Sequence, residues 1–333
     1  MIITLPTVGV YLTVITMAVL KASLRQETPS ILQENIIVQL RQITSPLHEV
    51  FLYSNWLRMW VFPSEVFEVL HDNHHPPKTI LLNIPTGGQL ELGYYPRKSV
   101  RSVPAVILAF GSHKKSLQPV DIGPSKRECL DTLRLEGHVV YTFGFRGCGR
   151  STGYNTSSTI EQDTKLIGKY IAHQHPDSPI IVYGWSVGGS YAASFADMHP
   201  EQTSALILDQ TFTSLEEVVQ ERVHRTTGVK NAPSRMIKPI LSLSGIQIEN
   251  RKKVQRLQNI GKITLAIHSP NDEIIPQSTC FKNACGGWGH LQGHIPCIGC
   301  KDIQNFILEH AAHICKETRR SSSEERSPSR SFP

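Results

Sequence analysis

A serine flanked by glycines, in GWSVGG at 184–189, is the most chemically suggestive feature of this 333-residue chain. The apolar run PIIVY precedes it, and small, helix-compatible residues follow it. In a G-x-S-x-G turn between a strand and a helix, glycines avoid side-chain collisions and the serine takes a strained backbone conformation. We therefore predict that Ser186 is a nucleophile whose hydroxyl is exposed above the end of a strand.

A serine hydroxyl becomes a good nucleophile only when a base takes its proton, and an acid must orient that base. After a turn of this kind, the acid and then the histidine follow the serine in chain order. The strand-like segment 263–269 leads into Asp272, so we predict Asp272 as the acid. The adjacent Glu273 and the earlier Asp209 are the alternatives, and Asp272 could also simply cap a turn.

Several histidines could act as the base. His290 and His294 follow a glycine-rich turn in GGWGHLQGHIP, whereas His310 and His313 lie within a helical pattern. A histidine in a loop can reach over the sheet, so we predict His290 as the base and keep His294 as the second choice.

A structural zinc site is the competing interpretation of the same region. Potential ligands crowd into 21 residues: Cys280, Cys285, His290, His294, Cys297 and Cys300. Cys297 and Cys300 form a CxxC, but no second clean pair completes a tetrahedral set. We therefore expect no metal, and under the zinc interpretation His290 would be a ligand rather than a base.

Composition indicates an ordinary globular protein, with 40% hydrophobic and 19% charged residues. The net charge of +6 is modest, and the basic residues are scattered, so no nucleic-acid surface is expected. Seven irregularly spaced cysteines argue against a disulfide scaffold and favour a reducing compartment.

Strand-like and helix-like segments alternate through the body of the chain, which predicts an α/β fold with a mostly parallel sheet covered by helices on both faces. The predicted strands are 79–85, 89–95, 105–110, 138–143, 179–184, 204–209 and 263–269, and the predicted helices are 126–137, 158–175 and 188–200. The first two strands alternate as an antiparallel hairpin would, while the later ones are continuous apolar runs. Active sites of such sheets lie at the carboxyl ends of the strands.

The ends of the chain differ from this body. Residues 1–20 contain no charged side chain and would span about 30 Å as a helix, so we predict a single-pass membrane anchor at 1–26. A signal peptide is the main alternative, and a buried hairpin is another. Residues 27–77 read as an amphipathic connector to a domain at 78–315, and the polar tail 316–333 is predicted to be disordered.

Five motifs together resemble the alpha/beta-hydrolase superfamily, and in particular its membrane-anchored ABHD-type serine hydrolases. They are VILAFGS (106–112), GFRGCGRSTG (144–153), GWSVGG (184–189), LILDQTFTSL (206–215) and HSPNDEIIP (268–276). The likeness covers residues 78–312. It departs from the family where Phe110-Gly111-Ser112-His113 replaces the usual His-Gly, and where no eighth strand is evident before His290.

The resemblance implies a Ser186–His290–Asp272 triad, with the backbone N–H groups of Val187 and Ser112 as the oxyanion hole. It implies hydrolysis of an ester or thioester in a small-molecule acyl or lipid substrate, without a cofactor, under a small helical cap at 214–258. A catalytically silent scaffold of the same fold is the alternative that the departures motivate.

Overall fold

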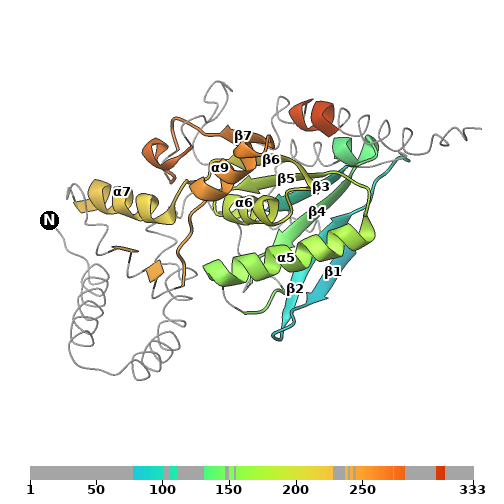
Figure 1. Ribbon diagram of the computed structural model, residues 1–333, viewed down its shortest axis with the longest axis horizontal. Coiled ribbons are helices and arrows are strands. Elements are labelled where there is room, and N and C mark those ends of the chain that lie inside the picture. The colour runs from blue at the N-terminus through green and yellow to red at the C-terminus, as the bar shows by residue number, and fades with distance from the viewer. Residues whose placement is uncertain are drawn as a thin grey trace, which may run out of the picture. The chain divides into compact units, whose positions relative to one another are not determined.

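A seven-stranded sheet organises the chain in a computed structural model (Figure 1). The structure describes residues 78–100, 105–110, 131–146, 150–153, 155–227, 237–238, 241–242, 245–272, 274–281 and 305–311. Within them the strand order is β1-β2-β4-β3-β5-β6-β7. The strands are β1 Lys78–Asn83, β2 Gln89–Tyr95, β3 Val106–Phe110, β4 Val139–Gly144, β5 Ile180–Trp185, β6 Thr203–Asp209 and β7 Ile263–Ile267.

The pairing of these strands confirms the predicted mostly parallel sheet. β1 and β2 form an antiparallel hairpin, β2 runs antiparallel to β4, and every pairing from β4 across to β7 is parallel. β3, β4 and β5 are buried along their whole length, as their uninterrupted apolar sequences require. The carboxyl ends of five parallel strands therefore meet at one edge of the sheet.

Helices α5 (Ser157–Gln174) and α6 (Gly188–Met198) cover one face of the sheet (Figure 1). A capping box starts α5, because Thr156 and Thr159 each accept a hydrogen bond from the other's backbone N–H. On α6, Tyr191 stacks on Phe145 with ring centroids 4.5 Å apart and on Phe110 at 5.8 Å. These aromatic contacts join α6, the helix that follows the turn at Ser186, to β3 and to the turn after β4.

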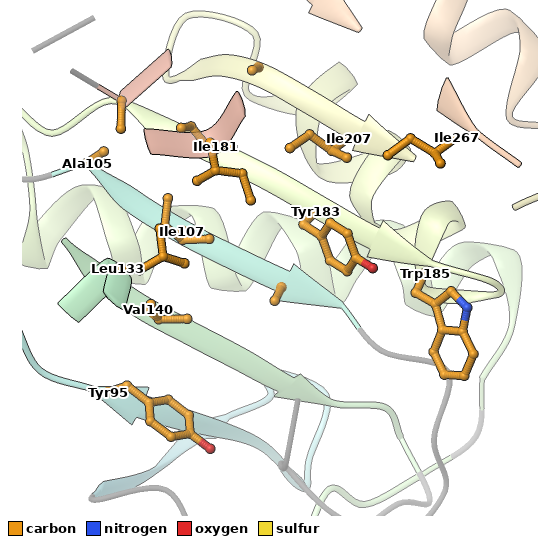
Figure 2. Packing of buried hydrophobic residues seen from close by; sticks show 14 residues of the cluster. Tyr95, Ala105, Ile107, Leu133, Val140, Ile181, Tyr183, Trp185, Ile207 and Ile267 are labelled. Carbon is orange, nitrogen blue, oxygen red and sulfur yellow. The ribbon is translucent and has the colours of Figure 1, made fainter. Parts of the chain in front are cut away.

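The opposite face of the sheet packs a second apolar cluster, shown in Figure 2. Ile107, Val140, Ile181 and Ile207 contribute from four neighbouring strands, and side chains of the described segments 131–135 and 305–311 close over them. Successive residues of a strand point to opposite faces of the sheet. Because every residue of β5 is buried, both faces of this strand are covered.

Residues Leu215–Ile248 belong to a different compact unit from the strands of the sheet. Its described part contains α7 (Leu215–Thr227) and a small apolar cluster of Ile237, Leu241 and Ile246. Residues 251–258, included in the predicted cap, form most of α9 (Arg251–Asn259), and α9 packs on α6 and β7.

The predicted anchor 1–26, the connector to residue 77 and the tail 316–333 lie outside the described residues. In the part of the chain that the structure describes, no helix combines the length and the apolar composition that a membrane span needs.

Gly168 offers a test of the packing between α5 and α6. A Cβ added there would lie 2.2 Å from Nε2 of His199, whose ring packs on Phe195. We expect Gly168→Ala to destabilise the fold by about 1–3 kcal/mol through overpacking. Thermal unfolding would show this as a loss of roughly 2–4 °C in Tm per kcal/mol.

The control for this substitution is the same change in a chain carrying His199→Ala. With the imidazole removed, Gly168→Ala should cost much less stability. Equal losses of Tm in the two backgrounds would show that a clash with the His199 ring is not what destabilises Gly168→Ala.

Candidate active site

Ser186 adopts the strained conformation that the glycine-flanked turn predicts. It follows β5 directly, and its φ of 55° lies in the left-handed region, which non-glycine residues rarely occupy. Such a residue costs about 1–3 kcal/mol and persists only where its surroundings enforce it. An observed outlier of this kind, at the carboxyl edge of a parallel sheet, marks a candidate catalytic position.

Close packing of the turn explains why glycines flank the serine. A Cβ on Gly184 would lie 2.5 Å from Cβ of Ala192 and 2.6 Å from Cα of Gly189. A Cβ on Gly189 would lie 2.3 Å from Oγ1 of Thr211. The strand end, the start of α6 and the end of β6 thus approach one another more closely than any side chain at these two positions would allow.

The hydroxyl of Ser186 is less accessible than predicted. The residue is only 1% exposed, so the expectation of an exposed hydroxyl is wrong for this structure. A sharp turn lifts the serine above the strand, but exposure also requires that the segments beyond the strand ends leave it open. Here Gln210 and Thr211, in the next turn along the sheet, are also buried.

Backbone and side-chain hydrogen bonds hold both peptide groups of Ser186. Its N–H donates to the carbonyl oxygen of Asp209 at 2.9 Å. Its carbonyl oxygen accepts from the N–H of Gly189 at 3.0 Å and from the hydroxyl of Thr211 at 2.6 Å. The end of β6 therefore supplies a partner on each side of the serine.

Asp272 lies in the turn that follows β7, at the same edge of the sheet. Its Oδ1 accepts hydrogen bonds from the N–H groups of Ile274 and Ile275, both at 2.8 Å, and the residue is 6% exposed. The carboxylate caps its own turn, and this fixes the orientation of the group. Capping and orientation of a histidine are compatible roles for one carboxylate.

The alternative acid Asp209 is engaged within the sheet. It is fully buried, and its Oδ2 accepts a short hydrogen bond from the hydroxyl of Tyr183 on the neighbouring strand. The other alternative, Glu273, lies outside the described residues.

His290, His294, His313 and Ser112 also lie outside the described residues, so the structure does not bring the predicted triad or oxyanion hole together. His310 is described, and its ring stacks on Phe306 at 4.8 Å. Val187 is the N-cap residue of α6 and makes no side-chain capping hydrogen bond; the first N–H groups of a helix lack partners within the helix.

Most of the proposed zinc ligands also lie outside the described residues. Among all the residues that the structure describes, no group of three or more His, Cys, Asp or Glu side chains is arranged to hold a metal ion. Cys280 is described: burial raises the pKa of its thiol, and the charge of Asp272 adds to this effect.

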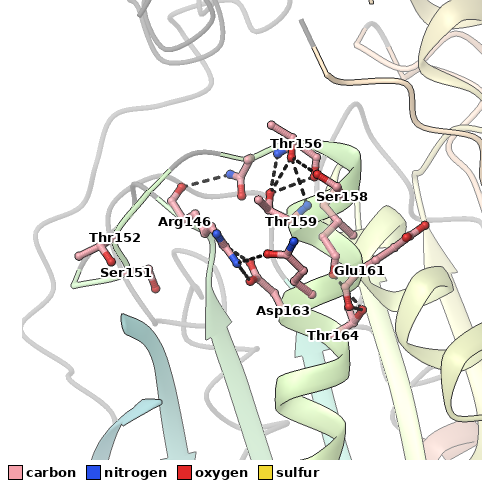
Figure 3. Close-up of polar contacts among 12 residues, drawn as sticks. Arg146, Ser151, Thr152, Thr156, Ser158, Thr159, Glu161, Asp163 and Thr164 are labelled. Carbon is pink, nitrogen blue, oxygen red and sulfur yellow. Dashed lines mark hydrogen bonds and ion pairs between the residues drawn. The ribbon is translucent and has the colours of Figure 1, made fainter. Parts of the chain in front are cut away.

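Figure 3 shows a buried ion pair between the turn after β4 and α5, which was not predicted from the sequence. Arg146, in the turn after β4, donates to Asp163 on α5 from Nε at 2.9 Å and from its terminal nitrogen at 2.6 Å. Asn155 donates to the carbonyl oxygen of Arg146 and accepts from Tyr191 on α6. The sequence signal was an acidic residue on the apolar stripe of α5, between Ile160 and Ile167.

Comparison with known proteins agrees with the fold described above. The family model for serine aminopeptidases of family S33 matches residues 126–278. Protein bem46 of Schizosaccharomyces pombe is 34% identical over 83 residues, which are 24% of this chain and 27% of that protein. The lysophosphatidylserine lipase ABHD12 of Bos taurus is 27% identical over 161 residues, 46% of this chain and 39% of that protein.

The matches to these curated relatives therefore span less than half of their length. Among solved structures, Est1E from Butyrivibrio proteoclasticus superposes with a TM-score of 0.51 at 14% identity, covering 70% of this chain and 99% of that one. That likeness supports the fold. The family model covers just under half of this chain, and together with the relatives and the strand order it shows that the chain is similar to proteins of the alpha/beta-hydrolase superfamily.

Proposed function

We propose that this chain is a serine hydrolase that cleaves an ester or thioester acyl bond. The observation that carries the proposal is the left-handed conformation of Ser186 between β5 and α6. A strained serine at the edge of the sheet where active sites of this fold lie is better explained as a catalytic nucleophile than as part of a purely structural turn. The lipase among the relatives supports an acyl or lipid substrate.

In the proposed mechanism Ser186 Oγ attacks the acyl carbonyl carbon while His290 takes the hydroxyl proton. The tetrahedral intermediate collapses to an acyl-enzyme, and His290 returns the proton to the leaving group. Water then attacks the acyl-enzyme with the same histidine as base, which regenerates the serine. No cofactor enters these steps.

Asp272 is the residue that would orient His290 in this mechanism. It follows β7, two strands beyond the nucleophile, and its turn bonds hold the carboxylate in one orientation. Asp209 is a weaker candidate because the hydroxyl of Tyr183 already engages its carboxylate inside the sheet.

The N–H of Val187 is the proposed first oxyanion donor, and that of Ser112 the second. Val187 stands at the amino end of α6, where the helix dipole favours developing negative charge. Preorganised donors of this kind are worth about 2.7–4 kcal/mol of transition-state stabilisation each.

Membrane attachment through residues 1–26 is also part of the proposal. It would place the site beside acyl chains presented by a bilayer. The uncharged stretch 1–20 supports it.

Ser186→Ala should abolish covalent labelling by a fluorophosphonate probe and hydrolysis of p-nitrophenyl butyrate. Ser190→Ala is the matched control, because Ser190 is also 1% exposed and lies on α6, the helix that follows the turn at Ser186. We expect the control to keep most of the labelling. A folded wild-type chain that neither labels nor hydrolyses would favour the silent scaffold.

His290→Ala should lower kcat by at least about a thousandfold with little change in KM, since the loss lies in the transition state. His294→Ala should cost far less. Activity of the wild type should fall as pH drops below about 6.5, where a neutral imidazole base becomes protonated. A pH–rate profile of all three chains measures this.

A structural zinc site would predict a loss of stability, instead of a specific loss of kcat, for substitutions in the same region. If His290 were a ligand, then His290→Ala, Cys297→Ala and a chelator would all lower Tm. Near-normal turnover in His290→Ala would remove this histidine from the triad.

The full-length chain should resist extraction from membranes by alkaline carbonate, because an uncharged 20-residue segment is long enough to span a bilayer. A chain that starts at residue 27 should be released. Recovery of the full-length protein in the carbonate-soluble fraction would contradict an integral anchor.

A further inference from the structure

Two left-handed residues stand side by side at the carboxyl edge of the sheet. Ser186 has a φ of 55° and Gln210 a φ of 47°. The last register pair of β5 and β6 is Trp185 with Asp209, so each strained residue comes directly after this pair. Figure 2 shows Trp185 at the end of β5, where this turn begins. The turn after β6 is thus as constrained as the nucleophile turn beside it.

The turn after β6 is fixed to the sheet on its far side. The N–H of Gln210 donates to the carbonyl oxygen of Ile267 at the end of β7, at 2.8 Å. Asp209 and Thr211 therefore flank a residue that β7 holds in place. Those two residues are the ones that bond the peptide groups of Ser186.

Thr211 is packed so that its hydroxyl can point in few directions. The residue is 3% exposed. Its Oγ1, Cβ and Cγ2 all lie within 2.8 Å of the position that a Cβ on Gly189 would take. The absence of that Cβ is what lets the threonine reach Ser186. At 2.6 Å, its bond to the carbonyl oxygen of Ser186 is shorter than the 3.0 Å bond from Gly189.

The carbonyl of Ser186 belongs to the same rigid plane as the N–H of Val187. A trans peptide directs its C=O and N–H to opposite sides, and rotation about the C–N bond is blocked. A donor that fixes the direction of this carbonyl therefore fixes the direction of the Val187 N–H. That N–H is the oxyanion donor of the proposed mechanism.

We propose that Thr211 is a positioning residue that aims the Val187 N–H, and with it Ser186, through the peptide between them. This inference rests on the proposed hydrolase function. Thr211 touches neither the substrate nor the reacting atoms in this role. Its contribution is to hold a preorganised donor, so the effect of losing it falls on the transition state rather than on substrate binding.

The test compares Thr211→Val, which removes the hydroxyl at nearly constant shape, with Thr211→Ser, which keeps it. Thr203→Val is the matched control: Thr203 is 1% exposed and donates to the carbonyl oxygen of His199 at 2.9 Å, at the opposite end of β6. The full-length chains are assayed for kcat and KM with p-nitrophenyl butyrate, for the rate of fluorophosphonate labelling, and for Tm.

We expect Thr211→Val to lower kcat and the labelling rate by about 10- to 100-fold at unchanged KM, the size of a loss from misplacing a catalytic group. Thr203→Val, with a similar fall in Tm, should stay within about twofold of the wild-type kcat. Thr211→Ser should recover most of the lost kcat, since hydrogen bonding rather than the methyl group carries the effect.

The outcomes separate the inference from the function on which it rests. A folded wild-type chain without labelling or turnover overturns the proposed function. An active wild type with Thr211→Val within twofold of it, or with Thr211→Ser as slow as Thr211→Val, overturns the positioning role alone. If Thr211→Val does not fold, Thr211→Ala against Thr203→Ala makes the same comparison.

Discussion

The backbone conformation of Ser186 is the constraint on which the rest of the site depends. A left-handed serine is unfavourable by about 1–3 kcal/mol and would relax in a free chain. Here Ser186 cannot relax to a more favourable conformation, because the preceding strand β5 is fully buried and the following helix α6 packs closely against the end of that strand. Gly184 and Gly189 make that approach possible, so the strain at the serine follows from packing at its two neighbours.

The sheet itself supports this turn from both faces. On one face, Tyr191 of α6 packs against the rings of Phe110 and Phe143. On the other face, an apolar cluster packs on β5, which pairs with β3 and β6. The ion pair of Arg146 and Asp163 ties the turn after β4 to α5 in the same layer. A buried pair of this kind is costly to break, because a lone partner would be left charged without water.

Most of the fold could be predicted from the sequence, because buried parallel strands leave a local signature. The strand 89–95 has the predicted limits, the strand predicted at 179–184 lies one residue later, and the strand predicted at 204–209 begins one residue earlier. The elbow could be predicted for the same reason, since strand, glycines and helix are contiguous. The burial of Ser186 could not, because segments remote in the sequence determine what covers a turn.

The partners of Ser186 show where local patterns stop being informative. Thr211 and Asp209 lie more than twenty residues from the serine, and nothing in LILDQTFTSL distinguishes a threonine that bonds a carbonyl from one that faces solvent. The strand register decides it: once Trp185 pairs with Asp209, the residues that follow each strand must meet. The parallel pairing of β5 and β6 thus brings the turns that follow these two strands into direct hydrogen-bond contact. A constraint on one turn therefore also constrains the other, and both turns together determine the orientation of Ser186.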